Sequence, residues 1–137
     1  MKLVFDQLSF EAAHYIPGHK GACAGIHGHT YIIKNLTLNV SDLALNEQGI
    51  VLDFGDVKEY FKTAWDHKFL IPEIDSEYWR HIYEECGSVP VKDNRKVLRG
   101  VSDEVMAIII HNDLRKLSHV MEVHFTLYEG LNQGVSV

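Results

Sequence analysis

The feature that most constrains the fold is a change in the spacing of apolar residues along the chain. Apolar and polar residues alternate in two opening segments, take helical spacing in two middle segments, and alternate again near the end. In chain order the segments are 2–14, 27–40, 54–66, 102–117, 119–129 and 134–137. The order β-β-α-α-β-β predicts an α+β fold, with two helices covering one face of a four-stranded antiparallel sheet.

Local signals refine these boundaries. The alternation over 2–14 slips near Gln7, which indicates a bulge. Asp56 is the expected cap of the first helix, and Ser102 with Asp103 the expected cap of the second. Residues 71–101 are less regular; SEYWRHIYEE predicts a short helix over 76–85 and KVL a short extended piece.

The size and the net charge of the chain limit the classes of function that it can have. The 137 residues suit one domain, 1–137, and an apolar content of 46% is enough for a core. A net charge of −6 argues against nucleic acid or an anionic membrane as a partner. With no long apolar run and no signal-peptide pattern, we expect a cytoplasmic protein with reduced cysteines.

The stretch GACAGIHGHTY, residues 21–31, carries the strongest chemical signal. His27 and His29 are two apart on a predicted strand, so both rings point to one face and offer two nitrogen ligands to zinc. His14 ends the neighbouring strand and can complete a three-histidine site with an open position. Four of the nine histidines, counting His19, fall within sixteen residues. We expect His19 to be a solvated loop residue.

Other interpretations of this stretch remain open. A lone H-x-H is most often two partly exposed strand histidines. A cupin-type metal site needs an acid four or five residues later, and YIIKN has none. Cys23 precedes His27 by four residues, so a nearby cation would favour its thiolate as a base or nucleophile. Equally, it can be a small buried side chain, as most free cysteines are.

Two further acidic positions are candidates. Asp66 precedes His67 at the end of the first helix, and a carboxylate can orient an imidazole for acid–base work. The simpler interpretation is a histidine at a helix terminus. Glu129 ends a strand before a glycine turn, where a carboxylate can accept two N–H bonds from a pterin or guanine edge. The simpler interpretation is a solvated turn acid.

Several motifs together resemble the 6-pyruvoyl-tetrahydropterin synthase family, and within it the bacterial 6-carboxy-5,6,7,8-tetrahydropterin synthases of queuosine biosynthesis. They are FEAAH, GHKGAC running into CAGIHGH, VLDFGDVK, DHKFL, SDE and YEG, and they follow the family's order over nearly the whole chain. The spacing of three residues between Cys23 and HGH resembles the bacterial enzymes. GVSDE departs from the more usual Pro-Thr-Ser/Ala-Glu, and 71–101 is longer than in compact members.

The resemblance implies a tunnelling fold whose chains assemble into trimers or hexamers through their sheet edges. It also implies residue roles. The implied zinc ligands are His14, His27 and His29; the implied catalytic residues are Cys23, Asp66 and His67; and the implied pterin-binding residues are Glu129, Glu104 and Ser102.

The predicted function is zinc-dependent conversion of 7,8-dihydroneopterin triphosphate to 6-carboxy-5,6,7,8-tetrahydropterin, with loss of triphosphate and acetaldehyde. The expected partners are the pterin triphosphate substrate and further copies of the chain, as a homotrimer or homohexamer, without nucleic acid or membrane. The alternatives are 6-pyruvoyl-tetrahydropterin formation, sepiapterin cleavage, or non-catalytic zinc or pterin binding.

Overall fold

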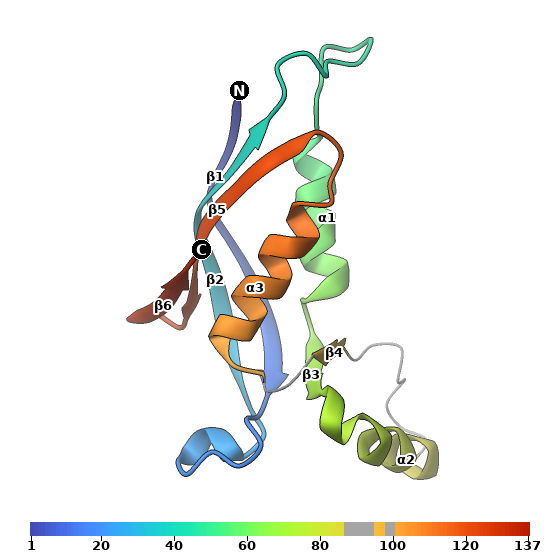
Figure 1. Ribbon diagram of the computed structural model, residues 1–137. Coiled ribbons are helices and arrows are strands. Elements are labelled where there is room, and N and C mark those ends of the chain that lie inside the picture. Colours follow the sequence, from blue (N-terminus) through green and yellow to red (C-terminus); the bar gives the residue numbers. More distant parts are fainter. Residues whose placement is uncertain (87–94, 98–100) are drawn as a thin grey trace.

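Three long antiparallel strands form the centre of the fold (Figure 1). The computed structural model describes residues 1–86, 95–97 and 101–137. Strand β2 (His27–Val40) lies between β1 (Lys2–His14) and β5 (Val120–Glu129) and pairs with both. The central strand is therefore paired on both edges.

Three shorter strands complete a sheet of order β4-β3-β1-β2-β5-β6. β6 (Gln133–Ser136) forms a hairpin with β5. β3 (Lys68–Pro72) pairs with β1 and β4 (Arg95–Val97) pairs with β3, both in parallel. The four predicted strands are all present. The two added strands have too few residues to show an alternation of their own, although the predicted extended piece at 96–98 overlaps β4.

Two helices cover one face of this sheet, as Figure 1 shows. They are α1 (Phe54–Ala64) and α3 (Asp103–Leu114), and each buries apolar side chains against the strands. The predicted α+β class is confirmed. Ser102 caps α3 as predicted, by accepting from the Val105 N–H at 3.4 Å. The cap of α1 is Asp53, which accepts from the Gly55 N–H, and not Asp56, which lies inside the first turn.

The segment between α1 and α3 forms a small unit beside β3. A short 3₁₀ turn (Glu73–Asp75) leads into α2 (Ser76–Cys86), which confirms the predicted short helix. The Tyr15 hydroxyl donates to Asp75 at 2.6 Å and accepts from Trp79 Nε1 at 2.8 Å. These bonds tie the unit to the residue that follows His14. Residues 87–94 and 98–100 of the same segment lie outside the described residues.

Both long strands change their buried face near one point. On β1 the inward positions shift between Phe5 and Phe10, which confirms the predicted slip. The bulge expected there is wrong, because β1 keeps one register against β2 throughout. On β2 they shift from Ile33 to Leu36, and Asn35 takes a left-handed φ of 54°. Strict alternation over 27–40 predicts that Asn35 and every second residue beyond it share the face of Tyr31, and that prediction is wrong. A non-glycine residue at positive φ interrupts alternation, and asparagine is among those that adopt it most readily.

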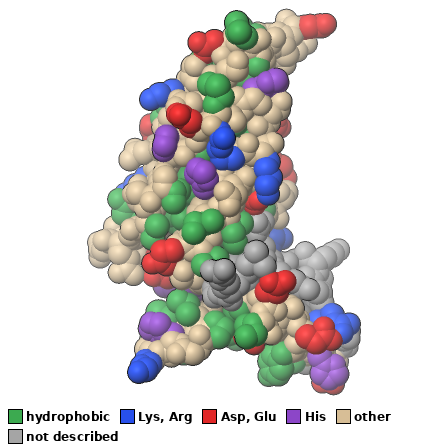
Figure 2. All heavy atoms as spheres, viewed as in Figure 1, with side chains coloured by type: hydrophobic (Ala, Val, Ile, Leu, Met, Phe, Trp, Pro, Cys, Tyr) green, Lys and Arg blue, Asp and Glu red, His purple; other side chains and the backbone are tan. Residues whose placement is uncertain are grey.

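The face shown in Figure 2 interleaves acidic, basic and histidine side chains, as the mixed composition predicts. Among the described residues, no helix is both long enough and apolar enough to cross a membrane.

Candidate functional site

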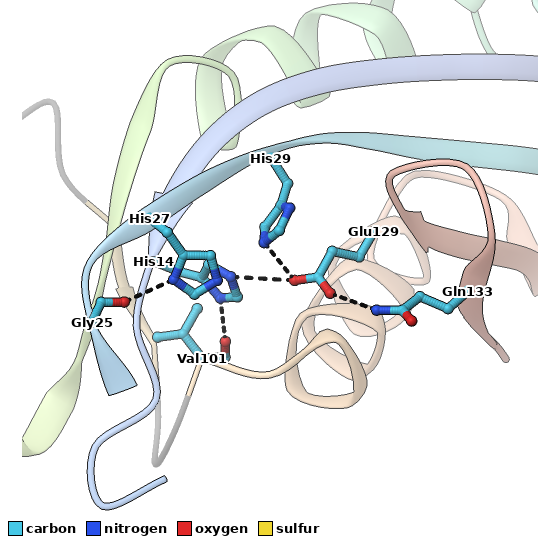
Figure 3. A network of polar contacts seen from close by, with 7 residues as sticks. All are labelled: His14, Gly25, His27, His29, Val101, Glu129 and Gln133. Carbon is cyan, nitrogen blue, oxygen red and sulfur yellow. Dashed lines mark hydrogen bonds and ion pairs between the residues drawn. The ribbon is translucent and has the colours of Figure 1, made fainter. Parts of the chain in front are cut away.

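Three histidine rings meet on the helix-covered face, where β1 ends and β2 begins (Figure 3). His14 and His27 are directly opposite each other in the β1–β2 pair, and His29 lies two residues further along β2. The ring centroids are 4.5 Å apart for His14 and His27, 5.3 Å for His14 and His29, and 4.8 Å for His27 and His29. The predicted cluster of three histidines is therefore present.

Backbone carbonyls orient two of the rings. His14 Nδ1 lies 2.6 Å from the Val101 carbonyl oxygen, and His27 Nδ1 lies 2.7 Å from that of Gly25. Because a carbonyl only accepts, each Nδ1 carries the hydrogen and each Nε2 keeps a free lone pair. Burial lowers the pKa of His14, against the raising effect of the Val101 bond. The ring is thus held neutral, as metal binding requires.

Glu129 faces the histidines from the end of β5. Its Oε1 lies 2.8 Å from His29 Nε2 and 3.4 Å from His14 Nε2, and its side chain is 15% exposed. Its Oε2 accepts from Gln133 Nε2 at 3.0 Å across the β5–β6 hairpin. The carboxylate is therefore positioned inside the site, and the solvated-turn interpretation does not describe it.

These four side chains fit a metal ion. One ligand atom from each of His14, His27, His29 and Glu129 lies within 4.8 Å of the others. Nε2 of His14 and Nε2 of His29 are buried and make no directed hydrogen bond with the described residues. Zinc takes imidazole nitrogen at about 2.0–2.1 Å, so a site of this span can contract onto one ion. Imidazole and carboxylate are donors that zinc accepts.

Cys23 lies on the loop between β1 and β2, in the 3₁₀ turn Ala22–Ala24. The Ile16 N–H donates to its carbonyl at 2.8 Å and folds the loop back. The thiol is free and half-buried. It is outside the group of four possible ligands, on the loop that leads into His27 four residues later.

Asp66 and His67 form a separate pair. Asp66 Oδ2 lies 2.9 Å from His67 Nδ1, and its Oδ1 accepts from the Glu11 N–H at 2.9 Å. The Glu11 N–H bond lowers the pKa of Asp66 most, with help from His67. The His67 side chain is 81% exposed and lines an open pocket of about 550 Å³ with Gly28 and Thr30. His29 lines the same pocket. Gly28 and Thr30 alternate with the inward-facing His27 and His29, so the side of the pocket that they form is the outward face of the sheet.

The start of α3 brings a further acid, Asp103, to the site. Ser102 serves as the helix cap, and its hydroxyl lowers the pKa of the exposed Glu104 by hydrogen bonding. Asp103, between them, is the inward-facing acid. Burial raises the pKa of Asp103 to about 6, with smaller contributions from the charges of Glu129 and Glu104.

The sequence did not identify four residues that lie around the site. Tyr31 follows His29 by two residues, so strand alternation already placed it on the same face. Gln133 and Val101 act through the hairpin and through a carbonyl, which no side-chain pattern reveals. For Asp103 no signal separated the inward acid of the SDE motif from the outward one.

Curated relatives are similar in sequence to part of this chain. It is 37% identical over 79 residues to the 6-carboxy-5,6,7,8-tetrahydropterin synthase of Haemophilus influenzae, covering 53% of this chain and 54% of that one. It is 30% identical over 85 residues to the enzyme of the same name from Rickettsia bellii, covering 59% of each chain. A putative 6-carboxy-5,6,7,8-tetrahydropterin synthase of Pyrococcus horikoshii is 31% identical over 100 residues, covering 72% of this chain and 57% of that one. The chain thus spans about three fifths of the length of the curated relatives it matches.

Solved structures agree in fold. The 6-pyruvoyltetrahydropterin synthase of Plasmodium vivax, as a catalytic-residue mutant, superposes with a TM-score of 0.63 at 23% identity, covering 100% of this chain and 96% of that one. The Plasmodium falciparum enzyme gives a TM-score of 0.57 at 23% identity, covering 100% and 94%. The fold is therefore the tunnelling fold. The family model described as 6-pyruvoyl tetrahydropterin synthase matches residues 4–137, and the chain belongs to that family.

Proposed function

We propose that this protein is a zinc-dependent tetrahydropterin synthase that converts 7,8-dihydroneopterin triphosphate to 6-carboxy-5,6,7,8-tetrahydropterin, releasing triphosphate and acetaldehyde. The observation that carries the proposal is the cluster of three histidines and Glu129, whose ligand atoms lie within 4.8 Å of one another, in a chain of this family. The names of the curated relatives favour the 6-carboxy product over the 6-pyruvoyl one.

His14, His27 and His29 would hold the zinc ion. The chemistry that a bound zinc ion supplies is polarisation of the substrate's side-chain hydroxyls, which lowers their pKa. The carbonyls of Val101 and Gly25 hold two of the rings in the ligating tautomer before any metal arrives.

Glu129 would anchor the pterin ring. A carboxylate can accept from the 2-amino group and from N3–H together, because these donors lie side by side in the ring plane. Gln133 already holds one carboxylate oxygen, so the anchor is fixed before substrate binds.

Cys23 and the Asp66–His67 pair would supply the acid–base groups. Cys23, on the loop that leads into His27, would move protons at the side-chain carbons. Asp66 holds His67 Nδ1, which leaves Nε2 to exchange a proton with substrate. Because the pair lies by the opposite face of the sheet, it would act in the site of a neighbouring copy of the chain.

An open sheet edge supports that assembly. β3 covers β1 only at Ala12 and Ala13, so among the described residues β2 is the only strand that pairs with β1 over residues 2–10. Proteins seldom leave a long edge of this kind unpaired. We therefore expect a homotrimer or homohexamer.

The deciding experiment is incubation of the zinc-loaded protein with 7,8-dihydroneopterin triphosphate, followed by product identification by mass and an acetaldehyde assay. The 6-carboxy product with acetaldehyde supports the proposal. The 6-pyruvoyl product without acetaldehyde would move the chain to the other activity of the family. If the protein binds the pterin but forms no product, it is a pterin-binding protein without this activity.

A further inference from the structure

We propose that Tyr31 and Asp103 form a second polar contact for the ring that Glu129 anchors, which makes them positioning residues of this site. The inference rests on the proposed pterin function. It goes beyond the residues that the family resemblance implied, because this chain has an acid where the usual pattern has Ser or Ala.

Tyr31 carries the first observation. Its side chain is fully buried, and among the described residues its hydroxyl has no hydrogen-bond partner. It lies directly opposite Glu129 in the β2–β5 pair and two residues beyond His29, so all three point to one face. Its ring contacts those of His14 and His29, at centroid distances of 5.9 and 5.7 Å. Buried hydroxyls are nearly always paired, so an unpaired one beside a cluster of ligands indicates a missing partner.

Asp103 carries the second observation, independently of the first. Its Oδ1 is buried and has no partner among the described residues. The Val101 carbonyl, two residues before Asp103, lies 2.6 Å from Nδ1 of His14, so the start of α3 meets the histidine cluster. The unpaired oxygen of Asp103 and the unpaired hydroxyl of Tyr31 are therefore both buried beside the histidine cluster. Burial also raises the pKa of Asp103 to about 6, as expected for a carboxyl group in such a place.

A purely structural role does not account for Asp103. An acid in the first turn stabilises a helix through its dipole, and the neighbouring Glu104 already does so while exposed and bonded to Ser102. Asp103 instead turns inward and leaves an oxygen unpaired. The two adjacent acids therefore form a natural comparison, one facing solvent and one facing the site.

The two groups suit the remaining edge of a pterin. Once Glu129 has paired with N3–H and one amino hydrogen, the other amino hydrogen and the acceptor N1 stay side by side. A hydroxyl and a carboxyl together offer both a donor and an acceptor. The expected ligand class is a fused 2-aminopyrimidin-4-one ring, and each contact adds to the selectivity for it because an unmatched ligand would leave these groups unpaired.

The test is the dissociation constant of biopterin for the zinc-loaded protein, measured by fluorescence titration. Tyr31→Phe and Asp103→Ala should each weaken binding about tenfold. Asp103→Asn keeps a donor and an acceptor and should stay within about threefold. The double variant Tyr31→Phe, Asp103→Ala should lose less than the product of the two single losses, since neighbouring contacts couple. Asp56→Asn, an exposed acid in the first turn of α1, is the matched control and should leave binding unchanged.

Zinc content and melting temperature, measured on every variant, separate a binding role from a structural one. Tyr31→Phe and Asp103→Asn have nearly native volume and should melt normally. If they do, and if Tyr31→Phe and Asp103→Ala bind biopterin as tightly as the unaltered protein, the inference is overturned. If Asp103→Ala does not fold, unaltered binding by Tyr31→Phe overturns the paired contact by itself. If the unaltered protein does not bind biopterin, the pterin function itself fails, and this inference with it.

Discussion

His14 and His27 are directly opposite each other in the antiparallel pair of β1 and β2, with ring centroids 4.5 Å apart. The candidate metal site therefore depends on strand pairing as much as on the H-x-H motif. A one-residue slip of β1 against β2 would carry His14 to the other face. The unbroken register from Lys2 to His14 is what brings the third histidine to the other two.

The first prediction concerns the metal. Purified protein should hold close to one zinc ion per chain, and His27→Ala should lose most of it, because two imidazoles compete poorly with water and buffer. Metal content by mass spectrometry measures this. His19→Ala is the control, since the His19 ring accepts from the Gly21 N–H on an exposed loop. Full zinc occupancy in a double variant of His27 and His29 would rule out the three-histidine site.

How much of this site could be predicted depends on the kind of signal. His14, His27 and His29 followed from strand alternation and from antiparallel pairing, both of which are local rules. Asn35 broke the alternation through a left-handed backbone angle, and that depends on the packing of three strands together. The inward turn of Asp103 depends on how α3 approaches the sheet, which residue spacing does not encode.

The fold shows the same division. The spacing of apolar residues predicted four strands and two helices. β3 and β4 are too short to give such a signal, and they are defined by pairing, β3 with β1 and β4 with β3. The sequence indicated that Asp66 and His67 could contact each other, and they do. Their place near the outward face of the sheet depends on the pairing of β3, which begins at the next residue. Long-range pairing thus decides what local patterns leave open.

The second prediction concerns Cys23. Cys23→Ala should keep its fold and its zinc but lose turnover by roughly a hundredfold or more, the usual scale for an acid–base group. The readout is the initial rate of product formation with saturating 7,8-dihydroneopterin triphosphate. Cys86→Ala, at the chain's other cysteine, should have nearly the unaltered rate. Equal rates in the two variants would remove the catalytic role of Cys23.

The third prediction tests whether sites are shared between chains. His67→Ala and Cys23→Ala should each be inactive alone. After co-refolding in equal amounts, random assembly would place both native residues in about a quarter of the shared sites, and activity should return to that extent. Light scattering should show a trimer or hexamer throughout. A mixture as inactive as its components would contradict sharing, and a stable monomer would contradict assembly itself.

The fourth prediction separates two roles of Glu129. Its Oε1 lies 2.8 Å from His29 Nε2, so it stands where either a pterin anchor or a fourth metal ligand could be. Glu129→Gln keeps the shape but replaces one acceptor with a donor, which faces a donor of the pterin. We expect biopterin affinity to fall about ten- to a hundredfold with zinc content unchanged, a cost of about 1–3 kcal/mol. Loss of zinc in Glu129→Gln would indicate the ligand role instead.

The last prediction concerns the pH dependence of stability through Asp103. Its pKa is raised from 3.8 to about 6 in the folded protein, chiefly by burial. Between these values the folded state binds more protons than the unfolded state, so unfolding free energy falls as pH rises. The stabilising contribution of the neutral acid is complete below about pH 4 and is lost as pH rises through about 6. Asparagine does not titrate and escapes that loss.

Asp103→Asn should therefore raise the melting temperature of the metal-free protein at about pH 8 relative to its effect at about pH 4. Partial exposure lets water screen these charges, so we expect about 1 kcal/mol, or roughly 4 °C in a domain of this size. Glu104→Gln should shift in the opposite direction, because the Ser102 hydroxyl lowers the pKa of Glu104. Zinc should shrink the Asp103 effect, since a nearby cation favours the carboxylate. A pH-independent difference between Asp103→Asn and the unaltered protein would show that Asp103 has an ordinary pKa and does not face this buried site.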